Sequence, residues 1–299
     1  MPGLLLVRYG ELALKSPPVR REFERTLRRN ILEQFVREGI EVRLRSDRGH
    51  LYVETAVPSR AIGVLRRVFG VTSVSEVHEV ASEREIIRDR LLELSGERLR
   101  PGARFAVRAR RTGQHPFTSQ ELARDLGGDV LERFADRSLS VDLERPEVEL
   151  FVEVRGPRTY LSFDRREGPG GLPLGVAGRL VAFVEGTRGA LGAFLMMKRG
   201  CRVALVASST GEPFAREVLA RFDPKLSLTL TGPPPADWPP VVRDRAEAIH
   251  ADGIVLPLSV EEYPAARELW GDRVVFSPTV GWTDPEVEER WMGVRALAA

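Results

Sequence analysis

The chain of 299 residues is long enough for two or three domains, and its 42% hydrophobic residues can build sizeable cores. Its formal net charge is only +2, Cys201 is the single cysteine and the four histidines lie far apart, so an internal disulfide and a cysteine cluster are excluded and no metal site is expected. No stretch approaches the roughly 20 apolar residues of a membrane span, and no signal peptide opens the chain, so we expect a cytoplasmic protein without a membrane partner.

Arginine supplies nearly all of the positive charge, because Lys15, Lys198 and Lys225 are the only lysines. A thermophile-like composition or codon usage explains this preference for arginine over lysine. Arginine also suits bidentate recognition of phosphate. Residues 1–78 hold 14 Lys and Arg against nine Asp and Glu, whereas the remainder is nearly balanced. Basic charge is therefore concentrated in the N-terminal third.

Residues 1–78 have the pattern of a ferredoxin-like domain. A short apolar run at 4–7 predicts a strand, and a helix follows from Pro17 to about Gly39, with apolar residues at helical spacing. Two strands flank the turn at 47–49, and a second helix ending at Gly70 precedes a last alternating strand. The order βαββαβ is the split-βαβ pattern.

Residues 79–169 predict a second α+β domain. One helix begins near Ser82, a plausible cap with Glu85 at capping-box spacing, and another begins near Ser119 as its cap. Between them, residues 104–111 alternate as a strand, and a hairpin is expected to turn at Gly156-Pro157.

Residues 174–299 predict a parallel, Rossmann-like α/β domain. A Gly- and Pro-rich stretch at 168–179 reads as a linker or turn cluster. Apolar strand runs then alternate with helical stretches, which is typical of a parallel sheet covered by helices. An irregular surface loop is expected at 231–240. The predicted strand runs are "LVAFV", "RVALVAS", "LSLTLTG", "GIVLPLS" and "RVVFSPTV".

Three stretches resemble the tRNA 4-thiouridine synthetase family, also called tRNA sulfurtransferases. "FAVRARRTGQHPFTSQELARDLGGDVLERF" (105–134) resembles the core of a THUMP domain, an RNA-binding module of tRNA-modifying enzymes. "VRYGELALKSPPVRREFERTLRRNI" (7–31) resembles the start of the family. "GPGGLPLGVAGR" (168–179), followed by "LMMKRG" (195–200), resembles the entry to its PP-loop pyrophosphatase domain. The resemblance covers about the first 200 residues, in the family's order.

The family adenylates a uridine in tRNA with ATP, and a persulfide-derived sulfur then displaces AMP. Its loop reads SGGxDS, and an ungapped count from "LMMKRG" places that loop on Val184, Glu185, Gly186, Thr187, Arg188 and Gly189. Only Gly186 matches among the five specified positions.

The departures affect every part of the family's phosphate cradle. Such a cradle needs small residues that bring backbone N–H groups to the phosphates at a helix N-terminus. Val184 and Gly189 remove both hydroxyls, and Arg188 reverses the sign of the group beside the magnesium ion. Glu185 adds a carboxylate, which at about 4 Å repels each phosphate charge by roughly 1 kcal/mol in water-like surroundings and about 4 kcal/mol at an effective dielectric of 20.

The sequence also offers fewer thiols than a persulfide relay usually uses. A persulfide relay uses a nucleophilic thiol and usually a second, resolving one. Cys201 is the single thiol, and a buried structural cysteine is the expectation. No catalytic residue is therefore assigned.

Two arginine faces are the candidate RNA contacts. On the strand at 104–111, Arg104, Arg108 and Arg110 share one face, and a solvated face of a half-buried strand is the alternative explanation. Phosphate contacts from such residues give affinity without reading sequence. The full candidate set is Arg20, Arg21, Arg25, Arg28, Arg29, Arg104, Arg108, Arg110 and Arg111.

The sequence therefore predicts a tRNA-binding protein with a degenerate PP-loop, without thiolation activity of its own and without a cofactor. The alternative is an active tRNA sulfurtransferase, or another adenylating tRNA-modification enzyme, that uses a rebuilt loop, ATP and Mg²⁺ and takes sulfur supplied in trans. A third interpretation is an interaction protein that binds no RNA. The sequence leaves open whether the protein forms a homodimer and whether it binds a separate modification enzyme or sulfur donor.

Overall fold

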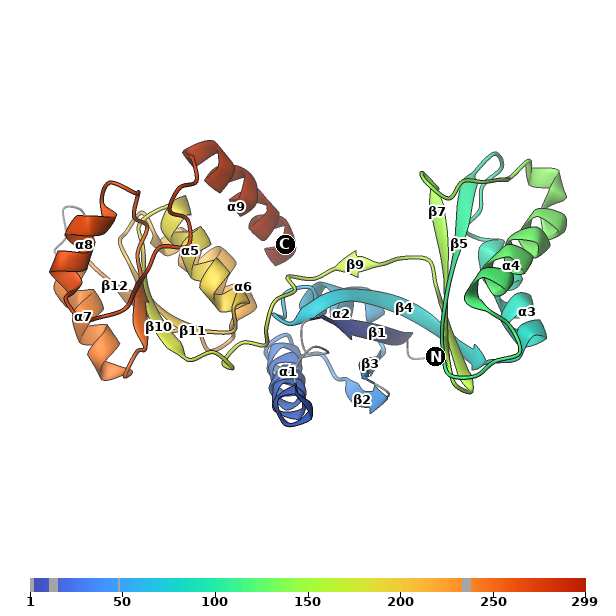
Figure 1. Ribbon diagram of the computed structural model, residues 1–299, viewed down its shortest axis with the longest axis horizontal. Helices are drawn as coiled ribbons and strands as arrows, with labels where there is room; N and C mark the ends of the chain where they lie inside the picture. Colours follow the sequence, from blue (N-terminus) through green and yellow to red (C-terminus); the bar gives the residue numbers. More distant parts are fainter. Residues whose placement is uncertain (1–2, 11–15, 48, 233–237) are drawn as a thin grey trace. The chain divides into compact units, whose positions relative to one another are not determined.

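The computed structural model describes residues 3–10, 16–47, 49–232 and 238–299 (Figure 1). The chain divides into two compact units. The first holds Met1–Leu6, Tyr52–Pro58 and Ser75–Arg166, and the second holds Val7–Leu51, Ser59–Val74 and Glu167–Ala299. The second unit thus combines parts of the N-terminal third with the whole C-terminal region.

The N-terminal third has the predicted βαββαβ order, and its strands follow the hydrogen-bonded order β2-β3-β1-β4. The apolar stripe of the first helix is buried at Leu27, Ile31 and Phe35, as its spacing predicts. Gly39 follows that helix with φ of +62°, a conformation that glycine adopts without strain. The elements are β1 (Gly3–Tyr9), α1 (Pro17–Arg37), β2 (Arg43–Asp47), β3 (His50–Thr55), α2 (Pro58–Leu65) and β4 (Val71–Ala81).

The middle region lies in the first unit and consists of a layer of helices packed on a β-sheet. Its strands continue in the order β4-β8-β7-β5-β6, and apolar side chains of both helices pack on one face of this sheet. The predicted hairpin is confirmed, since β7 and β8 pair antiparallel with Arg155 opposite Arg158. The elements are α3 (Arg84–Ser95), β5 (Arg104–Thr112), α4 (Ser119–Arg133), η2 (Ala135–Arg137), β6 (Ser140–Val141), β7 (Val148–Arg155) and β8 (Arg158–Ser162).

Both predicted helix caps in this region are wrong by one residue. Glu83 precedes α3, and the Ser82 hydroxyl instead shares a hydrogen bond of 2.9 Å with the Thr159 hydroxyl. Thr118, not Ser119, caps α4: its hydroxyl accepts from the Glu121 N–H, and the Glu121 carboxylate accepts from the Thr118 N–H. Thr118, Ser119 and Gln120 are adjacent polar residues, so the sequence alone does not show where the helix begins, and the backbone conformation decides which residue is the cap.

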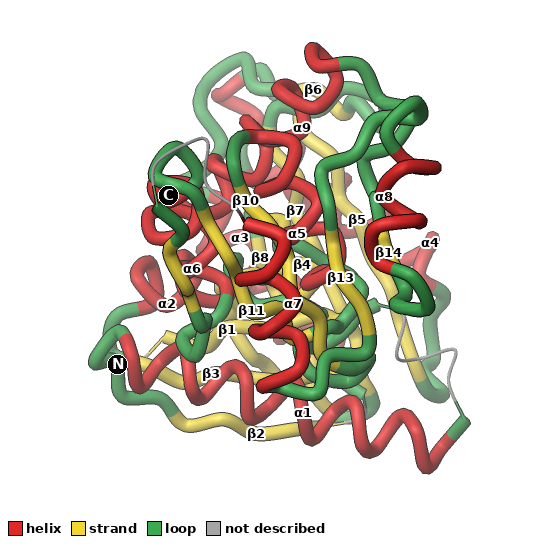
Figure 2. The backbone as a smooth tube through the Cα atoms, turned by 90° about the vertical axis from the view of Figure 1, so that its left-hand side faces the viewer, coloured by secondary structure: helices red, strands yellow, loops and turns green. Residues whose placement is uncertain are grey.

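The C-terminal region is a parallel sheet with helices on both faces, as predicted (Figure 2). Its strands follow the order β12-β11-β10-β13-β14. In the central strand β10, Leu180, Ala182 and Val184 face one core, and Val181 and Phe183 face the other. Strand β9 (Arg166–Glu167) precedes this region and pairs with β4. The elements of the region are β10 (Arg179–Val184), α5 (Thr187–Lys198), β11 (Arg202–Ala207), η3 (Phe214–Leu219), α6 (Ala220–Phe222), β12 (Leu228–Leu230), α7 (Trp238–Ala248), β13 (Gly253–Val255), α8 (Tyr263–Trp270), β14 (Val275–Phe276) and α9 (Asp284–Ala298).

The expected loop at 231–240 is only partly described, because residues 233–237 lie outside the described residues. At its end the expectation is wrong, since α7 begins at Trp238 and its first turn accommodates two prolines. The Trp238 ring stacks on Phe183, with ring centroids 4.1 Å apart and planes inclined by 11°. The tryptophan therefore anchors the helix to the sheet.

The Gly- and Pro-rich segment 168–178 is fixed by backbone hydrogen bonds. The Gly170 N–H donates to Val71 O at 2.8 Å, and the Leu172 N–H donates to Lys198 O at 3.0 Å. At Gly171, with φ of +74°, a Cβ atom would lie 2.1 Å from Lys198 O. Glycine is required there because the backbones approach too closely for any side chain.

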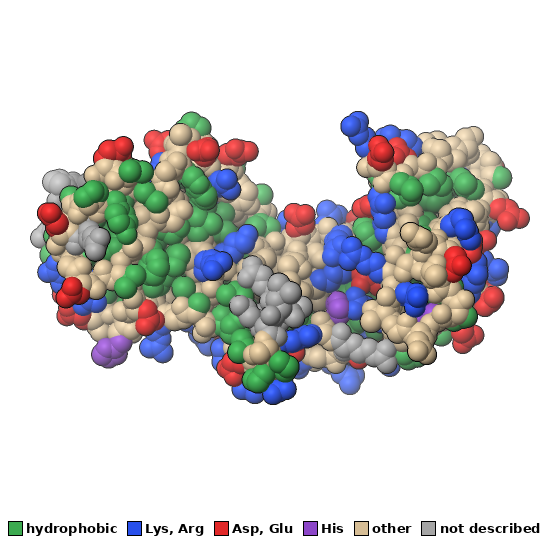
Figure 3. All heavy atoms as spheres, viewed as in Figure 1, with side chains coloured by type: hydrophobic (Ala, Val, Ile, Leu, Met, Phe, Trp, Pro, Cys, Tyr) green, Lys and Arg blue, Asp and Glu red, His purple; other side chains and the backbone are tan. Residues whose placement is uncertain are grey.

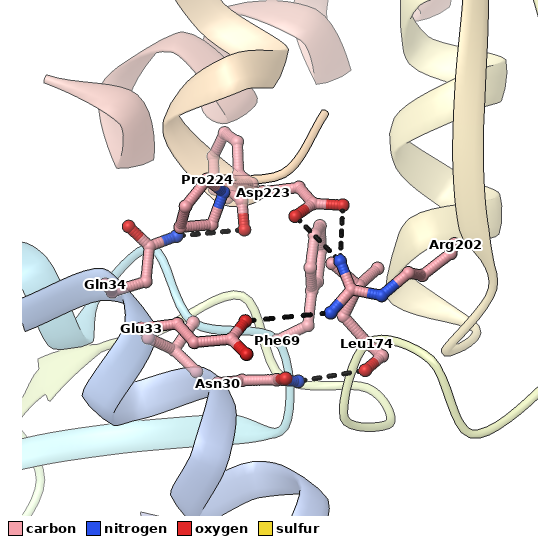
Figure 4. A pocket seen from close by; sticks show the side chains of 10 residues that line it. Asn30, Glu33, Gln34, Phe69, Leu174, Arg202, Asp223 and Pro224 are labelled. Carbon is pink, nitrogen blue, oxygen red and sulfur yellow. Dashed lines mark hydrogen bonds and ion pairs between the residues drawn. The ribbon is translucent and has the colours of Figure 1, made fainter. Parts of the chain in front are cut away.

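Helix α1 packs against the C-terminal region inside the second unit (Figure 4). The Asn30 amide donates to Leu174 O at 2.9 Å, and the Gln34 amide donates to Phe222 O at 3.0 Å. Phe69 joins the same core, with its ring centroid 5.2 Å from Phe194 and 5.5 Å from Phe222. One hydrophobic core of the second unit therefore combines Phe69 with side chains of the C-terminal region.

Candidate functional site

The candidate nucleotide loop lies where this fold class binds ligands. Strand β10 is followed on one side by β11 and β12, and on the other side by β13 and β14. The chain reverses its direction of winding at β10, and ligands of open α/β sheets bind beyond the carboxyl ends of the strands at such a point. Val184 is the last residue of β10, so the loop begins at that edge.

The loop is a tight strand-to-helix turn of two residues. Gly186 has extended backbone, and α5 begins at the next residue, so the Ala190 N–H donates to Gly186 O at 3.0 Å. A Cβ atom at Gly186 would meet nothing within 4 Å, so this position has open space, and the Glu185 side chain is exposed. The N–H groups of the first helical turn are oriented for an anion, as in any helix N-terminus.

Arg188 points away from this turn toward the segment before α9. Its guanidinium donates to Thr279 O at 2.9 Å, Trp282 O at 2.8 Å and the Asp284 carboxylate at 2.7 Å. The arginine side chain is only 22% exposed, whereas Asp284 is 89% exposed, so the two carbonyl contacts carry most of its binding. Arg188 thus joins the loop to a segment more than 90 residues later in the chain.

A second loop, Ser208–Gly211, packs directly against the first. The Ser208 N–H donates to Val184 O at 3.2 Å, and the Thr210 hydroxyl donates to Glu185 O at 2.9 Å. Gly211 is so close that a Cβ atom there would lie 1.8 Å from Val184 O. Sequence reasoning missed this loop, although "SSTG" directly after an apolar strand run is a usable signal.

Gly189 also makes a close backbone contact. A Cβ atom at this position would lie 2.7 Å from Phe183 O and 3.1 Å from the Cα of Val184. Contacts below 3.0 Å with backbone atoms require the backbone to move, so the present turn has no room for a serine at the position where the family has its second hydroxyl.

Cys201 is buried, and its thiol donates to Ala177 O at 3.3 Å. Burial, reinforced by Asp252, raises the pKa of the Cys201 thiol. A raised pKa suppresses the thiolate that acts as nucleophile. Among the described residues there is also no group of three or more His, Cys, Asp or Glu arranged to hold a metal ion.

The arginine face of β5 is matched by carboxylates. Arg104 pairs with Asp142 at 3.2 Å and with Glu147 at 3.1 Å, and Arg108 pairs with Glu149 at 2.9 Å. Arg111 donates to Gly113 O at 2.9 Å, whereas Arg110 is exposed and contacts no acceptor among the described residues. The parallel register places Ala106 opposite Glu149, so Arg108, two residues further along the same face, reaches that carboxylate. Arg110 lies opposite Glu153, but the Glu153 carboxylate pairs with Arg155.

The arginines of α1 are less occupied. Arg20 pairs with Glu24 at 2.9 Å, Arg25 pairs with Glu22 at 3.3 Å, and Arg28 donates to the Ser46 hydroxyl. Arg21 and Arg29 are exposed and have no ion-pair partner among the described residues. Arg21, Arg25 and Arg29 are spaced four residues apart and so follow one face of the helix.

No helix in the described part of the chain combines the length and the apolar character that crossing a membrane requires.

Known families match the first two regions of the chain. Residues 4–75 match the ThiI ferredoxin-like domain, and residues 81–164 match the THUMP domain. The chain is 38% identical over 263 residues to the probable tRNA sulfurtransferase of Aeropyrum pernix, a match that covers 85% of this chain and 64% of that protein. It is 36% identical over 226 residues to the probable tRNA sulfurtransferase of Methanobrevibacter smithii, a match that covers 74% of this chain and 57% of that protein. The chain thus spans less than two thirds of the length of these relatives.

Two solved structures share the fold along most of the chain. The protein PH1313 from Pyrococcus horikoshii superposes with a TM-score of 0.79 at 26% identity, covering 98% of this chain and 99% of that one. A 4-thiouridine synthetase, solved as an RNA complex with bound ATP, gives a TM-score of 0.75 at 22% identity, covering 100% and 86%. At this identity the second likeness shows the fold alone.

A ThiI-type ferredoxin-like domain, a THUMP domain and a C-terminal parallel sheet define a THUMP-domain protein of mixed α/β architecture. Within that class, the chain is similar over most of its length to the tRNA sulfurtransferase family, whose ThiI ferredoxin-like and THUMP domains it carries. The resemblance of its three sequence stretches to this family is therefore confirmed.

Proposed function

We propose that this protein binds tRNA through its ferredoxin-like and THUMP domains and does not itself activate the RNA with ATP. Support for RNA binding comes from the match of residues 81–164 to the THUMP domain, from the relatives named probable tRNA sulfurtransferase, and from the RNA complex of a structurally similar synthetase. The exposed arginines of α1 and Arg110 supply phosphate contacts.

The position of Arg188 carries the second half of the proposal. In the family, the acidic residue at this position helps to hold the magnesium ion that accompanies ATP. In this chain the position is an arginine, whose guanidinium donates hydrogen bonds to Thr279, Trp282 and Asp284. Glu185 is exposed at the turn, and Gly189 has no room for a hydroxyl-bearing side chain. The residues present therefore do not fit the family's phosphate cradle, and no reaction step is assigned to it.

An active enzyme with a rebuilt loop is the second candidate. One observation favours it: the turn retains open space at Gly186 beside the N-terminus of α5, at the ligand-binding edge of the sheet. In that case ATP would bind to helix N–H groups, and sulfur would come from a separate donor. Homodimers and partner enzymes remain compatible with both candidates.

Two titrations on the purified protein separate these candidates. Fluorescence anisotropy with a labelled folded tRNA is expected to show binding that weakens steeply between 50 and 200 mM salt, since counterion release drives phosphate contacts (about 10³-fold or more for six contacts). Calorimetry with Mg-ATP is expected to show no saturable heat. Saturable micromolar ATP binding would favour the active enzyme, and failure to bind tRNA at low salt would refute the RNA-binding proposal itself.

A further inference from the structure

The second unit contains a cluster of arginines around one carboxylate, at the C-terminal end of α1. Glu38 caps this helix, and its carboxylate accepts from Arg67 at 3.1 Å and lies 3.9 Å from Arg37. Arg60 donates to the Glu38 backbone O at 3.4 Å. The cluster thus has several guanidinium groups for a single negative charge.

Arg67 is the most deeply placed member of the cluster. Its side chain is only 8% exposed, and its Nε atom is buried without a hydrogen-bond partner among the described residues. Burial lowers the pKa of Arg67, the Glu38 carboxylate opposes that effect, and the nearby charges of Arg221 and Arg37 lower the pKa further. Arg221 comes from α6, more than 150 residues later, where the backbone contacts the last turns of α1: the Gln34 amide donates to Arg221 O at 3.0 Å and Arg37 donates to Ala220 O.

Arg221 has no acceptor for its guanidinium among the described residues, and its side chain is exposed. It also lines an open cavity of about 400 Å³, together with Phe214, Glu217, Trp291 and Arg295. Figure 3 shows Lys and Arg side chains gathered over α6 on the face that it displays. A ligand from solution can therefore reach the guanidinium of Arg221 from this cavity, whose lining does not include Arg37 or Arg67.

The cluster is held in place by contacts that do not use its free donors. The Gln34 amide donates to Arg221 O and Phe222 O, both at 3.0 Å, and Arg37 donates to Ala220 O. These bonds join α6 to the last turns of α1. The arrangement is thus preorganised before any ligand binds, which lowers the entropy cost of binding.

We propose that Arg37, Arg67 and Arg221 form a phosphate-binding site of the second unit. Crowded guanidinium groups repel each other, and one carboxylate leaves their charge uncompensated. A phosphate group offers several acceptor oxygens and matches the forked donors of arginine. The phosphate comes either from the RNA backbone or from a small phosphorylated molecule, and the first source rests on the proposed function.

The test uses Arg221→Gln in the full chain, with Arg273→Gln as the matched control. Arg221 is exposed, so its replacement leaves the core intact, whereas Arg273 of the same unit pairs with Glu247 at 2.9 Å. Melting temperature is measured against sodium phosphate and against sodium chloride of equal ionic strength. We expect a saturable rise of about 2–4 °C in phosphate for the wild type and for Arg273→Gln. The rise should be lost in Arg221→Gln.

An equal rise in all three proteins, or no saturable rise in the wild type, would overturn the site. A tRNA titration then distinguishes the two phosphate sources. If RNA is the source, Arg221→Gln should lower the slope of log K against log salt by about 0.7–0.9, and Arg273→Gln should not. An unchanged slope combined with a lost phosphate response supports the site with a small-molecule source. Because the phosphate arm needs no RNA, it decides the site even if the wild type binds no tRNA.

Discussion

At the scale of single residues, Arg188 shows how one substitution can give a loop residue a new structural task. The position holds an acidic residue in the family, yet here the guanidinium binds two backbone carbonyls of the segment before α9. Carbonyl oxygens that would otherwise need water are satisfied by a charged donor, which is among the stronger hydrogen bonds in proteins. Arg188 therefore contributes to folding rather than to a phosphate site.

Replacing Arg188 by Ala should lower the free energy of unfolding by about 2–4 kcal/mol, because two charge-assisted hydrogen bonds are lost and the exposed pair with Asp284 adds little. Chemical denaturation measures this loss. Asp284→Ala is the matched control and should cost less than about 1 kcal/mol. A stable Arg188→Ala protein that has lost an ATP affinity present in the wild type would contradict this assignment.

Tyr9 gives the N-terminal third a dependence on alkaline pH. Burial raises the pKa of Tyr9 to about 12, and its hydrogen bond of 2.7 Å to the Glu24 carboxylate acts in the same direction. The folded state therefore keeps this proton more tightly than the unfolded state does. Its stabilising effect is complete below the ordinary pKa of 10.0 and is lost as the pH rises to about 12.

The wild type should therefore lose about 1–2 kcal/mol more than Tyr9→Phe between pH 9 and pH 11.5, after allowance for the partial exposure of the phenol. Urea unfolding at several pH values measures the difference. Tyr263→Phe, which removes an exposed phenol, serves as the control and should retain the pH dependence of the wild type. Parallel pH profiles for the wild type and Tyr9→Phe would contradict the prediction.

At the scale of elements, α1 and β5 are unequal as candidate RNA surfaces. Both carry arginines at the period of their secondary structure, but β5 lies beside β7, whose glutamates are in register with it. On α1, Arg21 and Arg29 have no such partners among the described residues. An arginine already bound by a carboxylate must break that pair before it can bind a phosphate, so the helix is the better phosphate-binding surface.

The double variant Arg21→Ala/Arg29→Ala should weaken tRNA binding more than Arg104→Ala/Arg108→Ala, with the salt slope falling by about 1.4–1.8 for two lost contacts. Both pairs remove two charges, so net charge is matched. Anisotropy titrations at three salt concentrations give the slopes. If the β5 double variant causes the larger loss of tRNA affinity, the carboxylates on β7 do not prevent the β5 arginines from binding tRNA.

Patterns close in sequence predicted most elements, and contacts distant in sequence were not predictable. The stripe Leu27, Ile31 and Phe35 located α1, because helical period is a local property. The acceptors of Arg188 lie 91 to 96 residues away, so no local pattern contains them. Glu149 as partner of Arg108 depends on the register of two strands, which a single strand's alternation does not specify.

At the scale of the whole molecule, the order of domains along the chain differs from the grouping of the chain into compact units. Phe69 belongs to the sequence region that matches the ferredoxin-like domain, yet its ring packs with Phe194 and Phe222 in the core of the second unit. Glu33 of α1 also pairs with Lys225. Figure 4 shows Arg202 between Glu33 and Asp223, 3.8 Å from the first carboxylate and 2.9 Å from the second. Helix α1 and the C-terminal sheet are therefore expected to unfold together.

Phe69→Ala should reduce the stability of the second unit by about 3–5 kcal/mol, since Phe69 is only 1% exposed. Hydrogen exchange should accelerate in both α1 and α5 and stay slow in α4. Phe105→Ala, at an equally buried position in the first unit, should accelerate α4 and spare α5. Unchanged exchange in α1 of the Phe69→Ala protein would show that the helix does not depend on this core.

The glycine-rich segment 168–178 has a consequence for how such proteins are recombined in evolution. Gene fusion and exon exchange succeed at tethers that tolerate insertion, because few contacts cross them. Here the Gly170 and Leu172 N–H groups bond to Val71 and Lys198, and Gly171 lies against the Lys198 carbonyl, so an inserted residue would break contacts on both sides. A new catalytic module could therefore replace the C-terminal sheet only together with the surface of α1, and these two parts are expected to be inherited as a pair.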